Sequence, residues 1–265
     1  MSVLKVSVLG AVLAVETTGD GPPLVLVHGF TGNRRLWDAL WPALGAGRRL
    51  VRYDLRGHGQ SEEPQPAPYR HPRDLAALLD ALGVEACDLV GVSMGGAIAL
   101  SFALDYPLRV RRLVLASPGI AGWEWSDGWR ALWRPIAHAA QAGDLARARE
   151  LWFEHPLFAA TRALPAAAAK LRASIAAYSG AHWAEGDREE PVLPDLDRVS
   201  DLAPPTLLLT GTEDLADFRL IADLIAAAAP AVRRIDYPGA GHLVNLERPK
   251  AFAADIAAFL EATPA

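Results

Sequence analysis

The sequence predicts an α/β protein with a mostly parallel, eight-stranded sheet flanked by helices. Short apolar runs of strand length alternate with longer helical patterns through most of the chain, as in sheets of parallel strands. Several of these runs end in glycine-rich turns. Hydrophobic residues make up 51% of the 265 residues, which suits a sheet that is buried on both faces.

The predicted strands begin with a pair at the amino terminus. Lys5 and Ser7 alternate with Val6 and Val8, and Gly10 breaks the apolar run. This pattern favours an antiparallel strand pair at the edge of the sheet over a signal peptide. The eight predicted strands span residues 3–8, 12–17, 24–28, 49–54, 87–92, 111–116, 205–211 and 232–237.

Helical patterns accompany the later strands and would cover the sheet. Pro249 suits the first position of the last of these helices, because no amide hydrogen is needed there. The predicted helices span residues 36–44, 72–82, 94–106, 217–229 and 249–261.

Composition and motifs exclude several classes of protein. A net charge of −5 with scattered arginines gives no basic footprint, so we expect no nucleic-acid partner. No stretch reaches the roughly 18 apolar residues that a membrane span requires, so we expect no membrane partner. Cys87 is the single cysteine and cannot form an internal disulfide, which favours a small core residue in a cytoplasmic protein. The sequence contains no metal or cofactor motif, so we expect a small-molecule substrate and no cofactor.

The alternation of strands and helices is interrupted between residues 119 and 203. Alanine-rich helical stretches at residues 137–152 and 165–178 occupy this region. We therefore predict a core of residues 1–118 and 204–265, with residues 119–203 as a helical insertion.

Six of the eight tryptophans lie in the helical insertion. Most should pack the insertion against the core, and one or two should face a substrate pocket. Three histidines there, His138, His155 and His182, have no metal-like spacing and are interpreted as surface or boundary residues. The tryptophans are Trp123, Trp125, Trp129, Trp133, Trp152 and Trp183, and the candidates for substrate binding are Trp123, Trp125, Trp129 and Trp152.

The segment Gly91-Val92-Ser93-Met94-Gly95 matches the nucleophile-elbow pattern GxSxG. An apolar run precedes it and a helical run of small residues follows it, as the pattern requires. Ser93 would then lie at a sharp turn from strand to helix, with its hydroxyl exposed. A Cβ would not fit in such a turn, and the flanking glycines permit it because they have none. The pattern predicts acyl-transfer chemistry through a serine.

A serine hydroxyl is a weak nucleophile at neutral pH, so this prediction requires a base and an acid. His242 lies in a glycine-rich loop after the last predicted strand, and Asp214 follows the strand before it. Both lie at the carboxyl ends of strands, where open parallel sheets bind ligands. A second acid, Asp217, reads as the cap of the following helix, so Asp214 is the predicted catalytic acid.

Donors for the developing oxyanion are predicted at two backbone amides. Met94 follows the nucleophile, and Phe30 lies in a glycine-rich loop after an early buried strand. His28 is expected to hold that loop by hydrogen bonds and not to titrate in the reaction. A bracing role at the sheet's upper edge is likewise expected for Asp54, Arg56 and His58.

These motifs resemble the α/β-hydrolase fold superfamily, within the capped group that includes enol-lactonases, carboxylesterases, carbon–carbon bond hydrolases and cofactor-free haloperoxidases. The chain order Ser93, Asp214, His242 is the order of that family's triad. The resemblance covers nearly the whole chain except its middle and implies that residues 119–203 form a cap over the triad. Two features depart from the pattern: Val92 stands where many relatives carry His, and the acid loop contains a second acid. Ser93 argues against haloalkane dehalogenases and epoxide hydrolases, which use Asp there.

The predicted reaction is hydrolysis of a small, largely apolar carboxylic ester or lactone through an acyl-enzyme intermediate. Carbon–carbon bond hydrolysis of a diketone is an alternative that would need an added polar group in the cap. Perhydrolysis without a cofactor would need only peroxide in place of water. A non-catalytic ligand-binding scaffold is disfavoured, because a scaffold gains nothing from a serine, a histidine and an aspartate at three strand ends.

Overall fold

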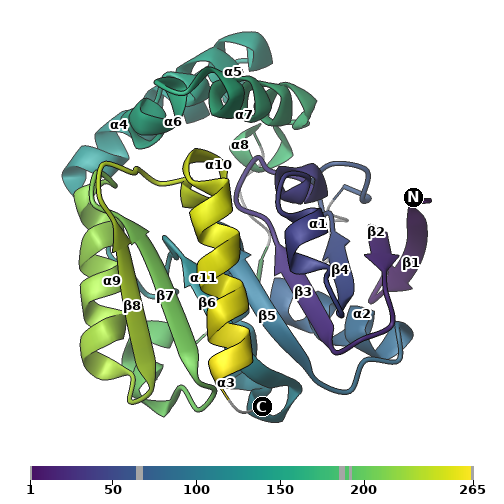
Figure 1. Ribbon diagram of the computed structural model, residues 1–265. Helices are drawn as coiled ribbons and strands as arrows, with labels where there is room; N and C mark the ends of the chain where they lie inside the picture. Colours follow the sequence, from purple (N-terminus) through teal and green to yellow (C-terminus); the bar gives the residue numbers. More distant parts are fainter. Residues whose placement is uncertain (1, 64–67, 185–188, 191–192, 264–265) are drawn as a thin grey trace.

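The structure is a computed structural model that describes residues 2–63, 68–184, 189–190 and 193–263 (Figure 1). It contains an eight-stranded sheet in the order β1-β2-β4-β3-β5-β6-β7-β8. The pairs β1–β2 and β2–β4 are antiparallel and the other neighbouring pairs are parallel, which confirms the predicted fold class and the strand pair at the amino terminus. The strands are β1 (Leu4–Val8), β2 (Ala11–Thr18), β3 (Pro23–Val27), β4 (Arg49–Tyr53), β5 (Cys87–Val92), β6 (Val110–Ala116), β7 (Thr206–Gly211) and β8 (Val232–Tyr237).

Helices cover both faces of the sheet (Figure 1). Successive residues of a strand point to opposite faces, so in β5 Val90 and Val92 join one apolar cluster and Leu89 joins the other. The first cluster includes side chains of α1 and α11, and the second includes those of α2, α3 and α9. These helices are α1 (Trp41–Leu44), α2 (His71–Ala81), α3 (Met94–Asp105), α9 (Ala216–Ala228) and α11 (Pro249–Ala262).

The helix predicted over residues 36–44 is wrong in its extent. The chain forms a 3-10 turn, η1 (Arg34–Trp37), and then the single-turn helix α1. Pro42 explains the difference. In the interior of one continuous helix it would lack an amide hydrogen and its ring would clash with the carbonyl of Asp38, whereas it is tolerated in the first turn of α1.

The helical insertion lies between β6 and β7, over the carboxyl ends of the parallel strands (Figure 1). The stretch predicted at residues 137–152 is two helices, because the chain turns at Gly143 with φ of +81°. The stretch predicted at residues 165–178 is one helix, as expected. The helices here are α4 (Asp127–Gln141), α5 (Leu145–Phe153), α6 (Ala159–Arg162), α7 (Pro165–Ala177) and α8 (Ala181–Ala184), with the 3-10 turns η3 (Pro156–Phe158), η4 (Asp195–Asp197) and η5 (Val199–Asp201).

The described residues include no helix that is both long enough and apolar enough to cross a membrane. They also include no group of three or more histidine, cysteine or acidic side chains arranged to hold a metal ion. Cys87 is fully buried at the start of β5, and burial raises the pKa of its thiol to about 12. A thiol in that state is an inert core group, as the sequence predicted.

Candidate active site

Ser93 lies at a sharp turn between β5 and α3. Its φ of +56° is a conformation that residues with a side chain rarely adopt, at a cost of about 1–3 kcal/mol. The amide of Ser93 donates to the carbonyl of Ala116 in β6 at 2.9 Å, and the amide of Ala97 donates to the carbonyl of Ser93 at 3.0 Å. These backbone bonds hold the turn, and the Ser93 side chain lines a cavity.

The glycines of the elbow have no room for a side chain. A Cβ on Gly91 would lie 2.1 Å from the carbonyl oxygen of Gly95, and a Cβ on Gly95 would lie 2.4 Å from that of His28. Both contacts are with backbone atoms, which cannot move aside as a flexible side chain could. The close packing predicted from the GxSxG pattern is therefore confirmed.

The structure brings Ser93, His242 and Asp214 together at the ends of three different strands. Nε2 of His242 lies 2.8 Å from Oγ of Ser93, and Nδ1 lies 2.9 Å from Oδ2 of Asp214. The carboxylate can only accept, so Nδ1 carries the hydrogen and Nε2 is free to accept the serine proton. The amide of Leu215 donates to Oδ1 of Asp214 at 2.7 Å and fixes the carboxylate. This arrangement can activate a serine nucleophile.

Asp217 is not the helix cap that the sequence predicted. Leu215 is the N-cap of α9, and Asp217 lies inside its first turn. Its carboxylate accepts from Nε1 of Trp123 at 3.1 Å and from the amide and hydroxyl of Ser126 at 3.0 and 2.6 Å. Burial opposes ionisation, but these hydrogen bonds outweigh it and lower the pKa of Asp217. Since Ser126 caps α4, Asp217 ties the start of the helical insertion to the acid loop.

Asp217→Ala should therefore destabilise the protein by about 1–3 kcal/mol, because the indole of Trp123 and the amide and hydroxyl of Ser126 lose their acceptor. KM should rise, since α4 carries residues that line the cavity, whereas kcat should stay near the wild-type value. Urea unfolding and steady-state kinetics measure the two effects. A double-mutant cycle with Ser126→Ala provides the control. Additive effects of the two substitutions on stability would contradict an interaction between Asp217 and the Ser126 hydroxyl.

Phe30 and Met94 both line the cavity beside Ser93. Met94 is the first residue of α3, so its amide has no acceptor within the helix and lies at the positive end of the helix dipole. The loop of Phe30 approaches closely, since a Cβ on Gly29 would lie 3.1 Å from Cβ of Ser93. The structure thus places both residues in the cavity wall near Ser93, and the oxyanion role of their amides stays a prediction.

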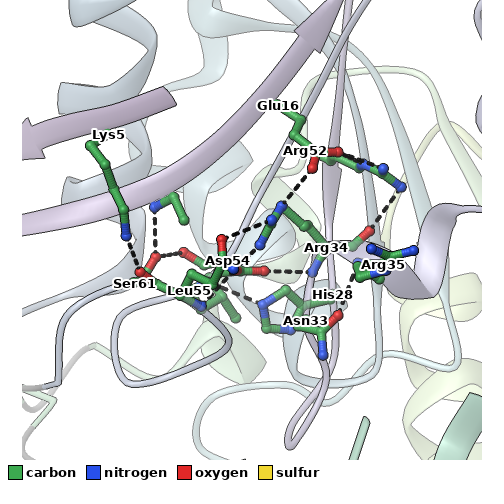
Figure 2. A network of polar contacts seen from close by, with 12 residues as sticks. Lys5, Glu16, His28, Asn33, Arg34, Arg35, Arg52, Asp54, Leu55 and Ser61 are labelled. Atoms are coloured by element: carbon green, nitrogen blue, oxygen red, sulfur yellow. Dashed lines mark hydrogen bonds and ion pairs between the residues drawn. The ribbon is translucent and has the colours of Figure 1, made fainter. Parts of the chain in front are cut away.

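A buried polar network holds the loop that carries Phe30 (Figure 2). Nε2 of His28 accepts from the amide of Leu55 at 3.0 Å, so its Nδ1 carries the hydrogen and donates to the carbonyl of the next residue at 2.8 Å. Asp54 accepts from the amide of Arg34 at 2.7 Å and pairs with its guanidinium. Both histidine nitrogens are thus engaged in holding the backbone, which agrees with the structural role expected for His28 and Asp54.

His155 is buried, not a surface or boundary residue as the sequence suggested. It is 3% exposed and packs beside Trp129 and Trp152, with ring centroids 5.3 and 5.1 Å away. Burial lowers its pKa to about 4. His138 is exposed and His182 is partly buried, as expected. The burial of His155 depends on how the insertion folds over the core, which no local pattern reports.

Three of the buried histidines should make the protein acid-sensitive. Burial lowers the pKa of His28, His58 and His155, so each favours its neutral form in the folded state. In the unfolded chain the same groups take up protons below about pH 6.5, which stabilises that state. The free energy of unfolding should therefore fall as the pH decreases from 6.5 to 5. In urea titrations, the free energy of unfolding should fall less steeply with pH for His155→Leu than for the wild type. The exposed control His138→Leu should show the same fall as the wild type. A free energy of unfolding that does not depend on pH would contradict this account.

A cavity of about 1150 Å³ extends from Ser93 and His242 to the helical insertion. The indole of Trp152 is fixed there, because its Nε1 donates to the hydroxyl of Thr31 at 2.8 Å. Trp183, by contrast, is not among the residues that line the cavity and packs against Tyr178. More tryptophans line the cavity than the one or two expected, because the insertion folds them over the core. The four predicted to bind substrate are all among them: Trp123, Trp125, Trp129 and Trp152.

Sequence reasoning missed other residues of this lining. Trp133 stacks with Trp129 at a centroid distance of 6.4 Å, and Phe218 packs on the His242 ring at 4.3 Å. The four-residue spacing of the tryptophans in α4 was an available signal, because residues at i and i+4 share one helix face. The missed lining residues also include Phe158 and the polar side chains Arg130, Arg134 and His182.

Sequence comparisons place this chain among known proteins. A family model described as alpha/beta hydrolase fold matches residues 22–249. A protein of Bacillus subtilis (strain 168), provisionally named a 2-succinyl-6-hydroxy-2,4-cyclohexadiene-1-carboxylate synthase, is 30% identical over 260 residues. That similarity covers 94% of this chain and 93% of the relative.

Solved structures are similar along the whole chain. The enol-lactonase from Burkholderia xenovorans LB400 has a TM-score of 0.85 and 25% identity, covering 97% of this chain and 100% of its own. A malate-bound thermophilic esterase from Thermogutta terrifontis has a TM-score of 0.82 and 28% identity, covering 99% of both chains. Because the family model spans most of the chain and the similarity includes the helical insertion, this protein belongs to the α/β-hydrolase fold family.

Proposed function

We propose that this enzyme hydrolyses a small, largely apolar carboxylic ester or lactone through an acyl-enzyme on Ser93. The observation that carries the proposal is the chain of hydrogen bonds from Ser93 through His242 to Asp214. Ser93 and His242 line a cavity with aromatic walls. Residues 119–203 would act as a cap domain over this cavity. The similarity to an enol-lactonase and an esterase supports the same reaction class.

In the proposed mechanism, Oγ of Ser93 attacks the substrate carbonyl while Nε2 of His242 takes its proton. Asp214 keeps the imidazole in the required tautomer and stabilises the imidazolium that forms. The amides of Phe30 and Met94 donate to the tetrahedral oxyanion, and such donors are worth about 3 to 4 kcal/mol each in comparable sites. The leaving oxygen takes the proton from His242. A water molecule, activated by the same imidazole, then hydrolyses the acyl-enzyme.

The cavity supports a substrate with a sizeable apolar group. Its volume of about 1150 Å³ is slightly above the range of roughly 300–1,000 Å³ that is usual for ligand pockets. Indole rings form much of its wall on the insertion side. An acyl or alcohol group that covers these rings would be removed from water, and this burial would drive binding.

Carbon–carbon bond hydrolysis of a diketone is a second candidate. This reaction needs a polar group in the cap to stabilise a carbanion, and polar residues of the insertion line the cavity, among them Arg130, Arg134 and His182. The two candidates differ in the bond that is cleaved, so a substrate comparison separates them.

The test is a panel of esters, lactones and vinylogous diketones, combined with a serine-directed phosphonate. We expect turnover of esters or lactones, and one phosphonate per chain on the peptide that contains Ser93, measured by mass spectrometry. Turnover of diketones alone would favour the second candidate. Labelling at another serine, or turnover that survives complete labelling, would refute the acyl-enzyme proposal.

A further inference from the structure

Glu247 is a buried carboxylate next to the proposed catalytic histidine. It ends the single-turn helix α10 (Val244–Glu247) and is 6% exposed. Its Oε2 accepts from the amide of Gly241 at 2.6 Å, and its Oε1 accepts from the amide of Leu243 at 3.3 Å. One carboxylate therefore holds the backbone on both sides of His242.

The same carboxylate also contacts the helical insertion. The hydroxyl of Thr161, in α6, donates to Oε1 of Glu247 at 2.6 Å, and Thr161 is fully buried. The backbone of the histidine loop also lies against α6, since a Cβ on Gly241 would be 2.8 Å from Cβ of Ala160. The insertion and the histidine loop thus meet at Glu247.

No basic side chain among the described residues forms an ion pair with Glu247. A buried carboxylate is costly unless hydrogen bonds compensate it. Here the compensating donors are the two amides that flank His242 and the hydroxyl of Thr161. The Glu247 carboxylate therefore keeps all three donors only when the histidine loop and α6 are both in place.

We propose that Glu247 is a positioning residue that couples the placement of α6 to the position of His242. This proposal rests on the catalytic role proposed for His242. Asp214 orients the imidazole ring through the hydrogen bond to Nδ1, whereas Glu247 fixes the backbone that carries the His242 side chain. A displacement of about 1 Å in a reacting group can cost on the order of 10²-fold in rate, so a loosened loop should reduce turnover.

The test uses Glu247→Gln, Thr161→Val and Thr161→Ser in the full chain. Glu247→Gln should lower kcat by about 10²-fold with little change in KM, because the amide cannot accept at all three sites. Thr161→Val should lower kcat by a smaller factor, and Thr161→Ser, which keeps the hydroxyl, should restore it. Steady-state kinetics and the rate of phosphonate labelling of Ser93 provide two measurements.

Proton NMR of the His242 Nδ1 hydrogen gives a readout that does not require turnover. The signal, which arises from the hydrogen bond to Asp214, should broaden or shift in Glu247→Gln and Thr161→Val. Asp88→Asn is the matched control. Asp88 is also a fully buried carboxylate, but it lies near the amino end of β5 and pairs with Arg112, so its loss should reduce stability and leave the His242 signal unchanged.

A normal His242 signal and normal kcat in both Glu247→Gln and Thr161→Val would overturn the proposal. A change in Glu247→Gln alone would overturn the coupling to α6. If Glu247→Gln does not fold, Thr161→Val still decides, since it removes only the contact with the insertion. Failure of the proposed function would appear differently, as ester turnover that persists in Ser93→Ala while the NMR signal still responds to Glu247.

Discussion

Ser93→Ala should lose about 10⁴- to 10⁶-fold in kcat on whichever ester or lactone the wild-type enzyme hydrolyses. The substitution removes the hydroxyl that would attack the carbonyl and leaves the elbow in place, because backbone bonds to β6 and α3 hold it. A residual rate should persist from substrate binding and the oxyanion donors. Initial rates with purified protein measure the loss, and circular dichroism checks that the fold is intact.

Ser117→Ala is the matched control for this experiment. Ser117 is a buried serine that, like Ser93, has a positive φ, at +42°, and it directly follows β6, the strand beside β5. No described histidine contacts its hydroxyl, so turnover should stay near the wild-type value. Similar losses in the two variants, or full activity in Ser93→Ala, would remove Ser93 from the role of nucleophile.

Asp214→Asn should reduce kcat by roughly 10⁴-fold and change KM little. The Asn carbonyl can still accept from the amide of Leu215, which would turn its NH₂ group toward Nδ1 of His242. The imidazole would then have to present Nδ1 as the acceptor and carry its hydrogen on Nε2, where it could no longer take the proton of Ser93. Steady-state kinetics on the same substrate measure the loss.

Asp217→Asn distinguishes the two acids of this loop. Asp217 faces Trp123 and Ser126 and does not contact His242 in the described structure, so kcat should be largely kept. The opposite pattern, with an active Asp214→Asn and an inactive Asp217→Asn, would assign the catalytic acid to Asp217. The phosphonate labelling rate of Ser93 should follow kcat in both variants.

The features predicted best are those whose cause is local. The eight strands follow from short apolar runs between turns, and the elbow follows from glycines whose missing Cβ atoms permit the backbone contact of Gly91 with Gly95. The helix predicted at residues 36–44 is wrong in its extent. Apolar residues recur at helical spacing through this segment, but Pro42 prevents one continuous helix.

Contacts between distant segments were predicted poorly. Asp217 was interpreted from its neighbours in sequence as a helix cap, yet its partners Trp123 and Ser126 lie more than 90 residues earlier. No local pattern marks Glu247 as part of the site, because its partner Thr161 is 86 positions away. An acidic residue is the same residue type whether it caps a helix, lies on the surface or belongs to a buried network. Only its neighbours in space therefore define its role.

The sequence by itself determined the strand order along the chain, the family resemblance and the identity of Ser93, Asp214 and His242 as candidates, because these depend on short motifs at the ends of strands. The tertiary structure alone decided which acid faces His242, which aromatic rings of the insertion line the cavity, and that Glu247 joins α6 to the histidine loop. The physical reason is that hydrogen bonds and packing act over a few ångströms in space, whereas sequence patterns report only on residues within a few positions of one another.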